Sequence, residues 1–265
     1  MSLRACVLAS GSAGNAVLVR GGQGALLVDA GLGLRDLGRR LAAVECDPDE
    51  LAGILLTHEH SDHVGCAPSL ARRLGIPVWC SRGTAAATER YWTDVTRPLP
   101  VRAGEVFEVA GLRVEAWACS HDAREPLQFG VEEGPARLAV CTDLGCVTDV
   151  VRESLRRRHL LILESNHDQG LLLKGSYPAF LKRRILGDRG HLSNQQCADV
   201  LCHVAGPELR HVILGHLSRE NNRPELALEA AGRALESSTH GSIRLDCARQ
   251  DQVGDWLDVF SGQTC

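Results

Sequence analysis

The segment with the clearest capacity for chemistry is residues 57–63, THEHSDH, which directly follows an apolar run. In an extended chain, side chains two residues apart point to the same side, so His58 and His60 can bind one ion together. If the chain then turns into a helix, Asp62 and His63 diverge from that pair and can bind a second ion. Imidazole nitrogens and carboxylate oxygens suit zinc, manganese or iron, and the absence of cysteine from the segment disfavours a closed structural zinc site.

Four side chains cannot complete the coordination of two ions, so further ligands are expected elsewhere in the chain. His121, Asp143 and His216 each follow an apolar run with the character of a strand. Any one of them alone could be a hydrogen-bonded polar residue at a strand end. Together they repeat one arrangement, a ligand just past an apolar strand, and Asp143 offers a carboxylate that can bridge two cations. We therefore expect one site along the rim of stacked sheets.

The elements that must position these residues are short. Strand-like runs, rich in valine and leucine, occur at residues 4–9, 16–19, 25–28, 53–56, 77–80, 106–109, 114–118, 128–131, 137–141, 160–163, 211–214 and 243–246. Segments with helical spacing occur at residues 34–44, 64–74, 84–92, 147–158, 178–186, 194–204 and 224–235. Two mixed sheets packed face to face, with helices outside, accommodate this order. No linker or repeat interrupts it, so we expect one domain over residues 1–265.

The composition of the chain says more about where the protein is located than about what it does. The formal net charge of −4 gives no overall basic field that would mark a nucleic-acid binder, although bound divalent cations would reverse the local sign of an acidic site. The eleven cysteines are an odd number without CxxC spacing, and no signal peptide opens the chain. No apolar run approaches the ~20 residues of a membrane span. We expect a soluble cytoplasmic protein with reduced thiols and no membrane partner.

Residues 57–63 resemble the HxHxDH signature of the metallo-β-lactamase superfamily, and the later histidine, aspartate and histidine follow that superfamily's order. Residues 26–31, LLVDAG, resemble its LIDxG segment, and the match covers nearly the whole chain. The resemblance implies an α/β fold, a four-layer αββα sandwich. It also implies two divalent transition-metal ions (zinc, manganese or iron), the first held by His58, His60 and His121, the second by Asp62, His63 and His216, with Asp143 bridging them. Cys66 stands where many members have a second glycine, a departure that touches no ligand.

Three further segments bear on the reaction. Residues 9–15, ASGSAGN, form a turn whose free backbone N–H groups could cradle an anion such as phosphate, although a tight hairpin needs the same residues. Residues 163–168, LESNHD, place five polar residues past an apolar strand, which favours the edge of a site. Residues 190–194, GHLSN, lead into a helix whose cap accounts for the serine or the asparagine but not for His191.

These three segments together resemble the bacterial YycJ/WalJ-type exonuclease branch of the superfamily, and ribonuclease Z shows a related arrangement. The resemblance implies that Glu164 and His191 act with Asp62 in catalysis, by orienting that carboxylate and handling the proton of the leaving group. The remaining polar residues of the segments are candidates for contacting substrate: Ser10, Ser12, Asn15, His167 and Asn194.

Phosphodiester cleavage suits this set of residues. Two cations about 3.5–4 Å apart can activate water at neutral pH and neutralise charge at phosphorus. Asp62 would orient the water, and His191, protonated with help from Glu164, would donate to the departing oxygen. A grip on a polynucleotide backbone, or simply a solvated surface, explains three basic residues: Arg183, Arg184 and Arg189.

The expected function is therefore a two-metal-dependent phosphodiesterase, and by resemblance a 5′-to-3′ exonuclease acting on DNA in preference to RNA. A small-molecule phosphodiesterase of the PhnP type, acting on a cyclic or similar phosphate, would keep every catalytic residue. Ribonuclease Z-like RNA processing is a further alternative, although the chain shows no inserted cap or arm of the kind that grips long RNA. A thioester or lactam hydrolase would not need Glu164 and His191, and an inactive scaffold would usually lack metal ligands. The oligomeric state stays open.

Overall fold

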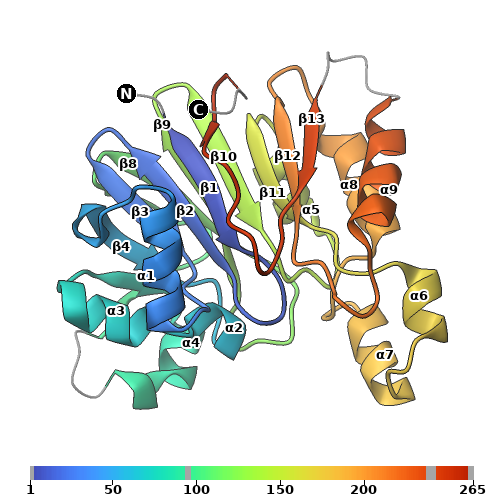
Figure 1. The fold of residues 1–265 in the computed structure, drawn as a ribbon, viewed down its shortest axis with the longest axis horizontal. Coiled ribbons are helices and arrows are strands. Elements are labelled where there is room, and N and C mark those ends of the chain that lie inside the picture. The colour runs from blue at the N-terminus through green and yellow to red at the C-terminus, as the bar shows by residue number, and fades with distance from the viewer. Residues whose placement is uncertain (1–2, 93–96, 237–242, 262–265) are drawn as a thin grey trace.

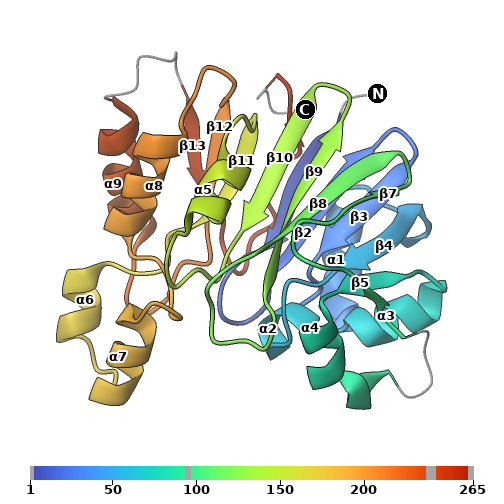
Figure 2. The ribbon, with the colours of Figure 1, turned by 180° about the vertical axis from the view of Figure 1, so that it is seen from behind.

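The computed structural model describes residues 3–92, 97–236 and 243–261, which build two seven-stranded sheets (Figures 1 and 2). The first sheet has the spatial order β14 (Leu257–Asp258), β1 (Arg4–Ala9), β2 (Ala16–Gly21), β3 (Gly24–Val28), β4 (Leu51–Leu55), β5 (Val78–Cys80) and β6 (Leu99–Pro100). The second has the order β13 (Arg244–Cys247), β12 (His211–Gly215), β11 (Leu160–Glu164), β10 (Ala136–Cys141), β9 (Leu127–Glu133), β8 (Leu112–Ala118) and β7 (Val106–Val109). Strands β3 to β6 run parallel to one another, as do β10 to β13.

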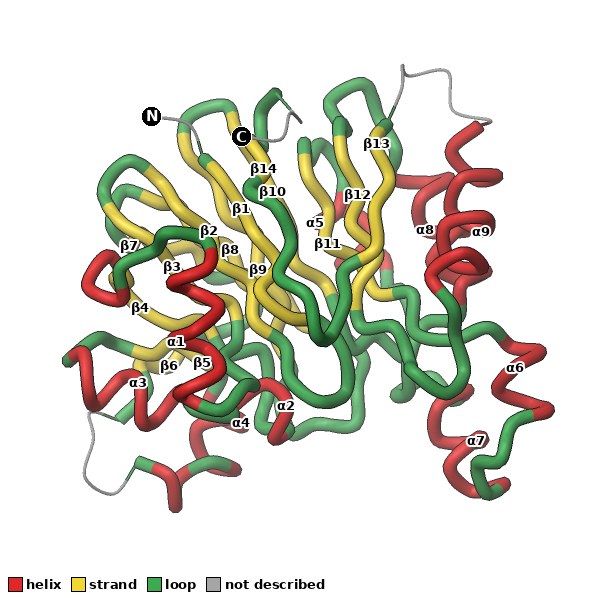
Figure 3. Tube along the Cα trace, in the orientation of Figure 1, coloured by secondary structure: helices red, strands yellow, loops and turns green. Residues whose placement is uncertain are grey.

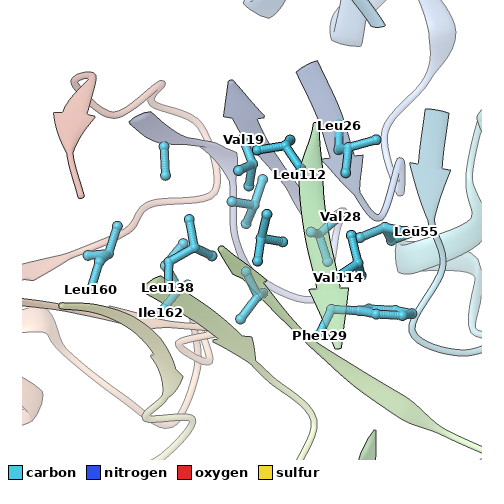
Figure 4. Close-up of a cluster of buried hydrophobic side chains, with 14 of the residues drawn as sticks. Val19, Leu26, Val28, Leu55, Leu112, Val114, Phe129, Leu138, Leu160 and Ile162 are labelled. Atoms are coloured by element: carbon cyan, nitrogen blue, oxygen red, sulfur yellow. The ribbon is translucent and has the colours of Figure 1, made fainter. Parts of the chain in front are cut away.

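The alternation of side chains along the strands explains why the two sheets pack face to face. In β1, Ala5 and Val7 lie in the apolar cluster between the sheets, whereas Cys6 and Leu8 lie in a second cluster under the outer helices. Successive strand residues point to opposite faces, so a strand buried on both faces is apolar throughout. Figure 4 shows the inner cluster, to which both sheets contribute, with Leu26, Val28, Phe129 and Ile162 among its members.

Helices cover the outer face of each sheet, which makes the four layers (Figure 3). The first sheet carries α1 (Leu34–Ala43), α2 (Ser61–Val64), α3 (Ala67–Leu74) and α4 (Arg82–Ala87), with 3₁₀ turns at Pro48–Glu50 and Glu89–Tyr91. The second sheet carries α5 (Asp149–Leu155), α8 (Asn194–Val204) and α9 (Pro224–Glu236). The predicted αββα sandwich is thus confirmed. Within the described residues, no helix combines the length and apolar character needed to cross a membrane.

Two predicted helices are wrong as single elements. The predicted helix 64–74 begins only at Ala67, as α3, because Val64 ends α2 and Gly65 adopts a φ of 34° between the two helices. A side chain at Gly65 would place its Cβ 2.5 Å from the carbonyl oxygen of Ala30, so this glycine lets the loop after β3 approach α2 closely. The predicted helix 84–92 is likewise divided, with α4 ending at Ala87 before a 3₁₀ turn.

A projection of two short helices is the largest departure from the predicted elements. Helix α6 (Gln169–Lys174) was not predicted, and α7 (Ala179–Leu186) follows it. Asp168 begins α6 by accepting a hydrogen bond from the backbone N–H of Leu171, which accounts for one polar residue of the LESNHD segment. Figures 1 and 2 show both helices standing away from the sandwich, at the same end of the molecule as α2. The two helices are short, so the expectation of no inserted cap or arm of the kind that grips long RNA stays a prediction.

Candidate metal centre and active site

The predicted ligands meet at the edge where parallel strands of both sheets end. Residues 57–63 follow β4, and Asp143 and His216 follow β10 and β12. His121 follows β8, which is antiparallel to β9 and therefore runs in the same direction as β10. The carboxyl ends of parallel strands are the usual position of a ligand site in α/β sheets. This placement agrees with the expectation of a site along the rim of the stacked sheets.

Three imidazole nitrogens form a first group. The Nδ1 atom of His60 lies 3.0 Å from Nε2 of His58 and 3.4 Å from Nε2 of His121. His58 and His121 are buried, whereas the side chain of His60 is 31 % exposed. The structure thus brings together the three residues predicted for the first metal, with one open side toward solvent.

A carboxylate and two imidazoles form a second group beside the first. The Oδ2 atom of Asp62 lies 3.5 Å from Nε2 of His63 and 3.6 Å from Nε2 of His216. Helix α2 starts directly after His60, and this turn directs Asp62 and His63 away from the first group. Gly31 lies against this turn, where only a glycine fits, because a Cβ at that position would lie only 1.6 Å from the carbonyl oxygen of Asp62.

The carboxylate of Asp143 lies between the two groups. Its Oδ2 atom is 3.1 Å from Nε2 of His63, and its Oδ1 atom is 3.7 Å from Nε2 of His121. Asp143 is buried, and its Oδ2 atom accepts no hydrogen bond from the residues that the structure describes. Its Oδ1 atom also lies 3.5 Å from Nδ1 of His216, so the carboxylate faces members of both groups, and its position suits the bridging role predicted for this residue.

The hydrogen bonds behind the histidines test whether the residues fit metal ions. His63 Nδ1 lies 2.7 Å from Asp29 Oδ2, and His216 Nδ1 lies 2.9 Å from Glu164 Oε1. His121 Nδ1 lies 3.1 Å from a backbone carbonyl oxygen. When Nδ1 donates to these acceptors, the lone pair of Nε2 faces the cluster, which is the usual arrangement of metal-binding histidines. The buried Nε2 of His216 has no hydrogen-bond partner among the residues that the structure describes, so the donor set fits divalent cations.

The electrostatics of the cluster favour positive charge. Burial alone would lower the pKa of His216, but the Asp143 carboxylate and the hydrogen bonds to Asp62 and Glu164 outweigh it and raise the pKa to about 10. Burial likewise opposes the charge of Asp143, yet His216 and His63 hold its pKa well below the usual range. The carboxylates that keep the buried histidines protonated also attract a metal cation. Protons and metal ions therefore compete for the same histidine nitrogens.

Three residues at this edge adopt a left-handed backbone conformation that is uncommon for residues with side chains. The φ angles are 60° at Asp29, 59° at Asp143 and 54° at His216, each just past the end of a strand. Backbone strain of this kind gathers at functional sites, where it aims a side chain that a continuing strand would not. The three turns direct their side chains into one cluster.

Comparison with known proteins decides the family. The sequence profile of the metallo-beta-lactamase superfamily matches residues 9–216. The chain belongs to this superfamily. It is 36% identical to exodeoxyribonuclease YycJ of Bacillus anthracis over 243 residues, covering 91% of this chain and 92% of the relative. It is also 36% identical to exodeoxyribonuclease WalJ of Streptococcus pneumoniae strain D39 over 225 residues, covering 83% and 84% of the two chains.

Solved structures support the same fold. The metallo-beta-lactamase fold protein YhfI from Bacillus subtilis matches with a TM-score of 0.71 and 15% identity, over 96% of this chain and 99% of that one. At this identity the likeness bears on the fold alone. Family membership and the histidine–aspartate cluster identify the chain as a metal-dependent hydrolase of the metallo-β-lactamase superfamily.

Glu164 connects the histidine–aspartate cluster of this hydrolase to His191. The Oε1 atom of Glu164 lies 2.8 Å from His191 Nδ1 and 2.9 Å from His216 Nδ1, while Oε2 accepts hydrogen bonds from the backbone N–H groups of Leu144 and Leu192. Burial opposes the charge of Glu164, but His191 and His216 outweigh it and lower its pKa to about 2. In turn, burial lowers the pKa of His191, and the Glu164 carboxylate outweighs that effect and raises it. The predicted pair is therefore in contact, but Glu164 also supports a predicted metal ligand.

Asp29 and Thr57 lie directly behind the candidate site, and the sequence interpretation assigned them no role. The Asp29 carboxylate accepts hydrogen bonds from the backbone N–H and the hydroxyl of Thr57, at 2.9 Å to Oδ1 and Oδ2 respectively. The same carboxylate orients His63. Both residues are buried. The signal was present, because Asp29 follows an apolar strand in the same way as the predicted ligands.

The loop of residues 9–15 holds the site together rather than offering a ring of free donors. The N–H groups of Gly11, Ala13, Gly14 and Asn15 donate to acceptors within the protein, so the expected anion cradle does not hold at these positions. Ser10 is buried, and its Oγ accepts the backbone N–H of His216 at 2.7 Å.

Asn15 is buried in that loop and its amide nitrogen lies 3.3 Å from the carbonyl oxygen of Asp62 and 3.1 Å from Nε2 of His63. Ser10 and Asn15 thus contact the ligands predicted for the second metal. Ser12 differs from both, because it is exposed and lines a pocket beside His191. Of the three loop residues predicted to contact substrate, Ser12 is the one placed at an open surface.

The other two predicted substrate contacts are buried. Asn194 accepts the hydroxyl of Ser165 at 2.7 Å, and its amide group exchanges hydrogen bonds of 2.8 and 2.9 Å with the amide group of Asn222. His167 is 1% exposed, and within the described part of the chain neither ring nitrogen has a hydrogen-bond partner. Burial lowers the pKa of His167 to about 4. The cap of α8 belongs to Ser193, whose hydroxyl accepts the N–H of Gln196.

Asp122 is a further residue at the site that the sequence interpretation passed over. Its Oδ1 atom lies 3.2 Å from Nε2 of His121 and 3.8 Å from Nε2 of His60, and its Oδ2 atom pairs with Arg184 on α7. Its place directly after His121 was the available signal. Of the three arginines considered for the polynucleotide backbone, Arg184 is thus tied to the metal cluster, whereas Arg183 and Arg189 are exposed nearby in sequence.

Proposed function

We propose that this chain is a two-metal-dependent phosphodiesterase, an exonuclease that removes nucleotides from the 5′ end of DNA. The observation that carries the proposal is the Glu164–His191 pair beside the histidine–aspartate cluster. Hydrolysis of a phosphodiester needs a proton for the departing oxygen, and such a pair supplies one. The names of the two exodeoxyribonuclease relatives, which align over most of the chain, support DNA as the polymer.

When bound, two divalent cations would supply Lewis-acid chemistry, by lowering the pKa of water and neutralising charge on the phosphodiester. The donor sets on which the proposal rests are His58, His60 and His121 for one cation, and Asp62, His63 and His216 for the other, with Asp143 facing both. Zinc, manganese and iron all suit these nitrogen and oxygen ligands.

The remaining steps belong to side chains at the open side of the cluster. Asp62 is 21 % exposed at its side chain, so the carboxylate can orient an attacking water while it faces the second group. The side chain of His191 is 22 % exposed, and Glu164 holds its Nδ1 atom. The opposite nitrogen, Nε2, would hold the proton that passes to the departing oxygen. The carboxylate of Glu164 stabilises the charged ring until that transfer occurs.

The test is turnover of end-labelled substrates with added manganese or zinc. We would compare 5′-labelled linear DNA, 5′-blocked linear DNA, covalently closed circular DNA, matched RNA and bis-p-nitrophenyl phosphate. Progressive release of mononucleotides from free 5′ ends, with circles spared, is the expected result. His191→Ala should abolish most of this activity, whereas His203→Ala, a change at an exposed histidine on α8, should not.

Other results assign other functions. Cutting of circular DNA at the same rate as linear DNA would make the enzyme an endonuclease. Faster processing of the matched RNA would favour ribonuclease Z-like activity. If nucleic acids survive while the small phosphodiester is hydrolysed, the chain is a small-molecule phosphodiesterase. Because the net charge is −4, we expect few phosphate contacts and a shallow decline of activity with salt.

A further inference from the structure

A pocket of about 280 Å³ opens between helix α7 and the loops that carry the site. One wall is apolar: Leu181 and Ile185 lie four residues apart on one face of α7, and Tyr177, just before the helix, lines the pocket beside them. All three are half-buried. His191 also lines the pocket, which therefore adjoins the proposed proton donor.

The facing wall is polar. Ser12 comes from the loop between β1 and β2, Asn166 follows β11, and Ser218 follows β12. Asn166 donates its amide to the backbone carbonyl of His216 at 2.8 Å, which fixes its side chain beside the cluster. The Ser218 Oγ accepts the N–H of Asn221 at 3.1 Å, and its hydroxyl hydrogen remains a donor for a ligand.

Helix α7 is held in place relative to the histidine–aspartate cluster. Lys182 donates to the backbone carbonyls of Leu173 and Gly175 at 2.8 and 2.7 Å, which ties α7 to the end of α6. Beyond α7, the N–H of His191 donates to the carbonyl of Ile185 at 3.0 Å. The pairing of Arg184 with Asp122 links the helix to the histidines of the first group. The apolar wall is therefore a fixed part of the site.

The shape and chemistry of the pocket indicate its ligand. A volume of about 280 Å³ is close to the lower end of the roughly 300–1,000 Å³ of small-molecule pockets, which suits one nucleotide rather than several. An aromatic ring with aliphatic neighbours suits the flat face of a nucleobase, since every base can stack in this way. Hydroxyl and amide groups on the opposite side suit the polar edge of the base or its sugar.

We propose that this pocket binds the base of the nucleotide that leaves with the proton from His191, with Tyr177 stacked against it. The proposal rests on the proposed function and deepens it, because it names the part of the substrate held beside the scissile bond. Stacking on Tyr177, with Leu181 and Ile185 beside it, would then select a terminus that carries a base over an abasic sugar phosphate.

The experiment compares two small probes by isothermal titration calorimetry on the metal-loaded protein. Deoxyadenosine 5′-monophosphate carries the base, and 2-deoxyribose 5-phosphate carries the same sugar phosphate without it. Because base–aromatic stacking is worth about 1–3 kcal/mol, we expect the nucleotide to bind roughly 5- to 150-fold more tightly. Tyr177→Ala should remove most of this difference, and Tyr177→Phe should retain it.

Phe180→Ala is the matched control, because Phe180 lies on α7 but its side chain is 68% exposed, away from the pocket lining. It should leave both affinities unchanged. Equal affinities for the two probes in the unaltered protein, or an undiminished difference in Tyr177→Ala, would overturn the pocket proposal. Hydrolysis of labelled DNA is measured in parallel. If the protein hydrolyses DNA but binds both probes equally, the pocket proposal is rejected and the nuclease proposal stands. If it prefers the nucleotide but does not hydrolyse DNA, the nuclease proposal is rejected and the pocket remains a nucleotide-binding site.

Discussion

The Nδ1 atom of His216 lies 2.9 Å from the Oε1 atom of Glu164. A predicted metal ligand is therefore hydrogen-bonded to a carboxylate that was predicted to assist proton transfer. The same oxygen lies 2.8 Å from His191 Nδ1. One buried carboxylate therefore supports two functions that the sequence interpretation kept apart. Removal of its charge should disturb both metal affinity and turnover.

The first prediction separates these two functions. Glu164→Gln should lower turnover and also weaken the second metal by about 10- to 100-fold, because partners behind a metal ligand contribute that much to affinity. His191→Ala should lower turnover by roughly 10²–10⁴ with metal content near that of the unaltered protein. Metal titration against a competing chelator, together with single-turnover kinetics, gives both quantities. Loss of metal in His191→Ala would identify His191 as a ligand.

The second prediction concerns the number of ions. Metal analysis of protein purified without chelator should find close to two transition ions per chain. Asp143→Ala should lower both occupancies, because the Asp143 carboxylate lies between the two groups of ligands. His216→Ala should mainly empty the second site. A single tightly held ion that Asp143→Ala leaves in place would rule out the bridging role.

The third prediction tests the support of His63 by Asp29. Asp29→Asn should weaken the second metal by about 10- to 100-fold, because the uncharged amide no longer fixes the imidazole with Nε2 toward the cluster. Asparagine tolerates the φ of 60° at this position, so the backbone should be undisturbed. Circular dichroism and thermal unfolding of the metal-free variant serve as the control. Unchanged metal affinity in a folded variant would contradict the proposed support.

The fourth prediction is a dependence of stability on pH. Burial lowers the pKa of His167 in the folded protein to about 4, from 6.5 in the unfolded chain. The unfolded chain therefore binds more protons between pH 6.5 and 4, and stability falls as the pH is lowered through this window. By linkage, the preferential protonation of His167 in the unfolded chain should lower the free energy of unfolding by about 2 kcal/mol from pH 7 to pH 5.

Denaturant unfolding of metal-free protein at both pH values measures this effect. His167→Asn removes the titrating group, so its stability should fall less between pH 7 and pH 5 than that of the unaltered protein. The other histidines titrate in both proteins, and the comparison cancels their contribution. Equal declines in the two proteins would show that His167 is not held neutral by the fold.

The sequence by itself determined the layers and most of the ligand set. Strands that bury both faces are apolar along most of their length, as in β1 after Arg4 and in β11 before Glu164, so most of them stand out as apolar runs along the chain. Ligands such as His121 and Asp143 stand a few residues beyond a strand end, and the carboxyl ends of parallel strands share an edge. Local pattern and general topology were therefore enough to place them near one another.

Only the tertiary structure decided which partners stand behind the ligands. Glu164 meets His216 across 52 residues of chain, and Ser10 meets the backbone of His216 across 206 residues. The period of a strand reports which face is buried, but not which atoms of the opposite sheet or loop lie against that face. For the same reason the pocket beside Tyr177 does not show in the sequence, because its walls come from separate loops and from a short helical projection. Their juxtaposition depends on how the two sheets and α7 pack, which no local pattern encodes.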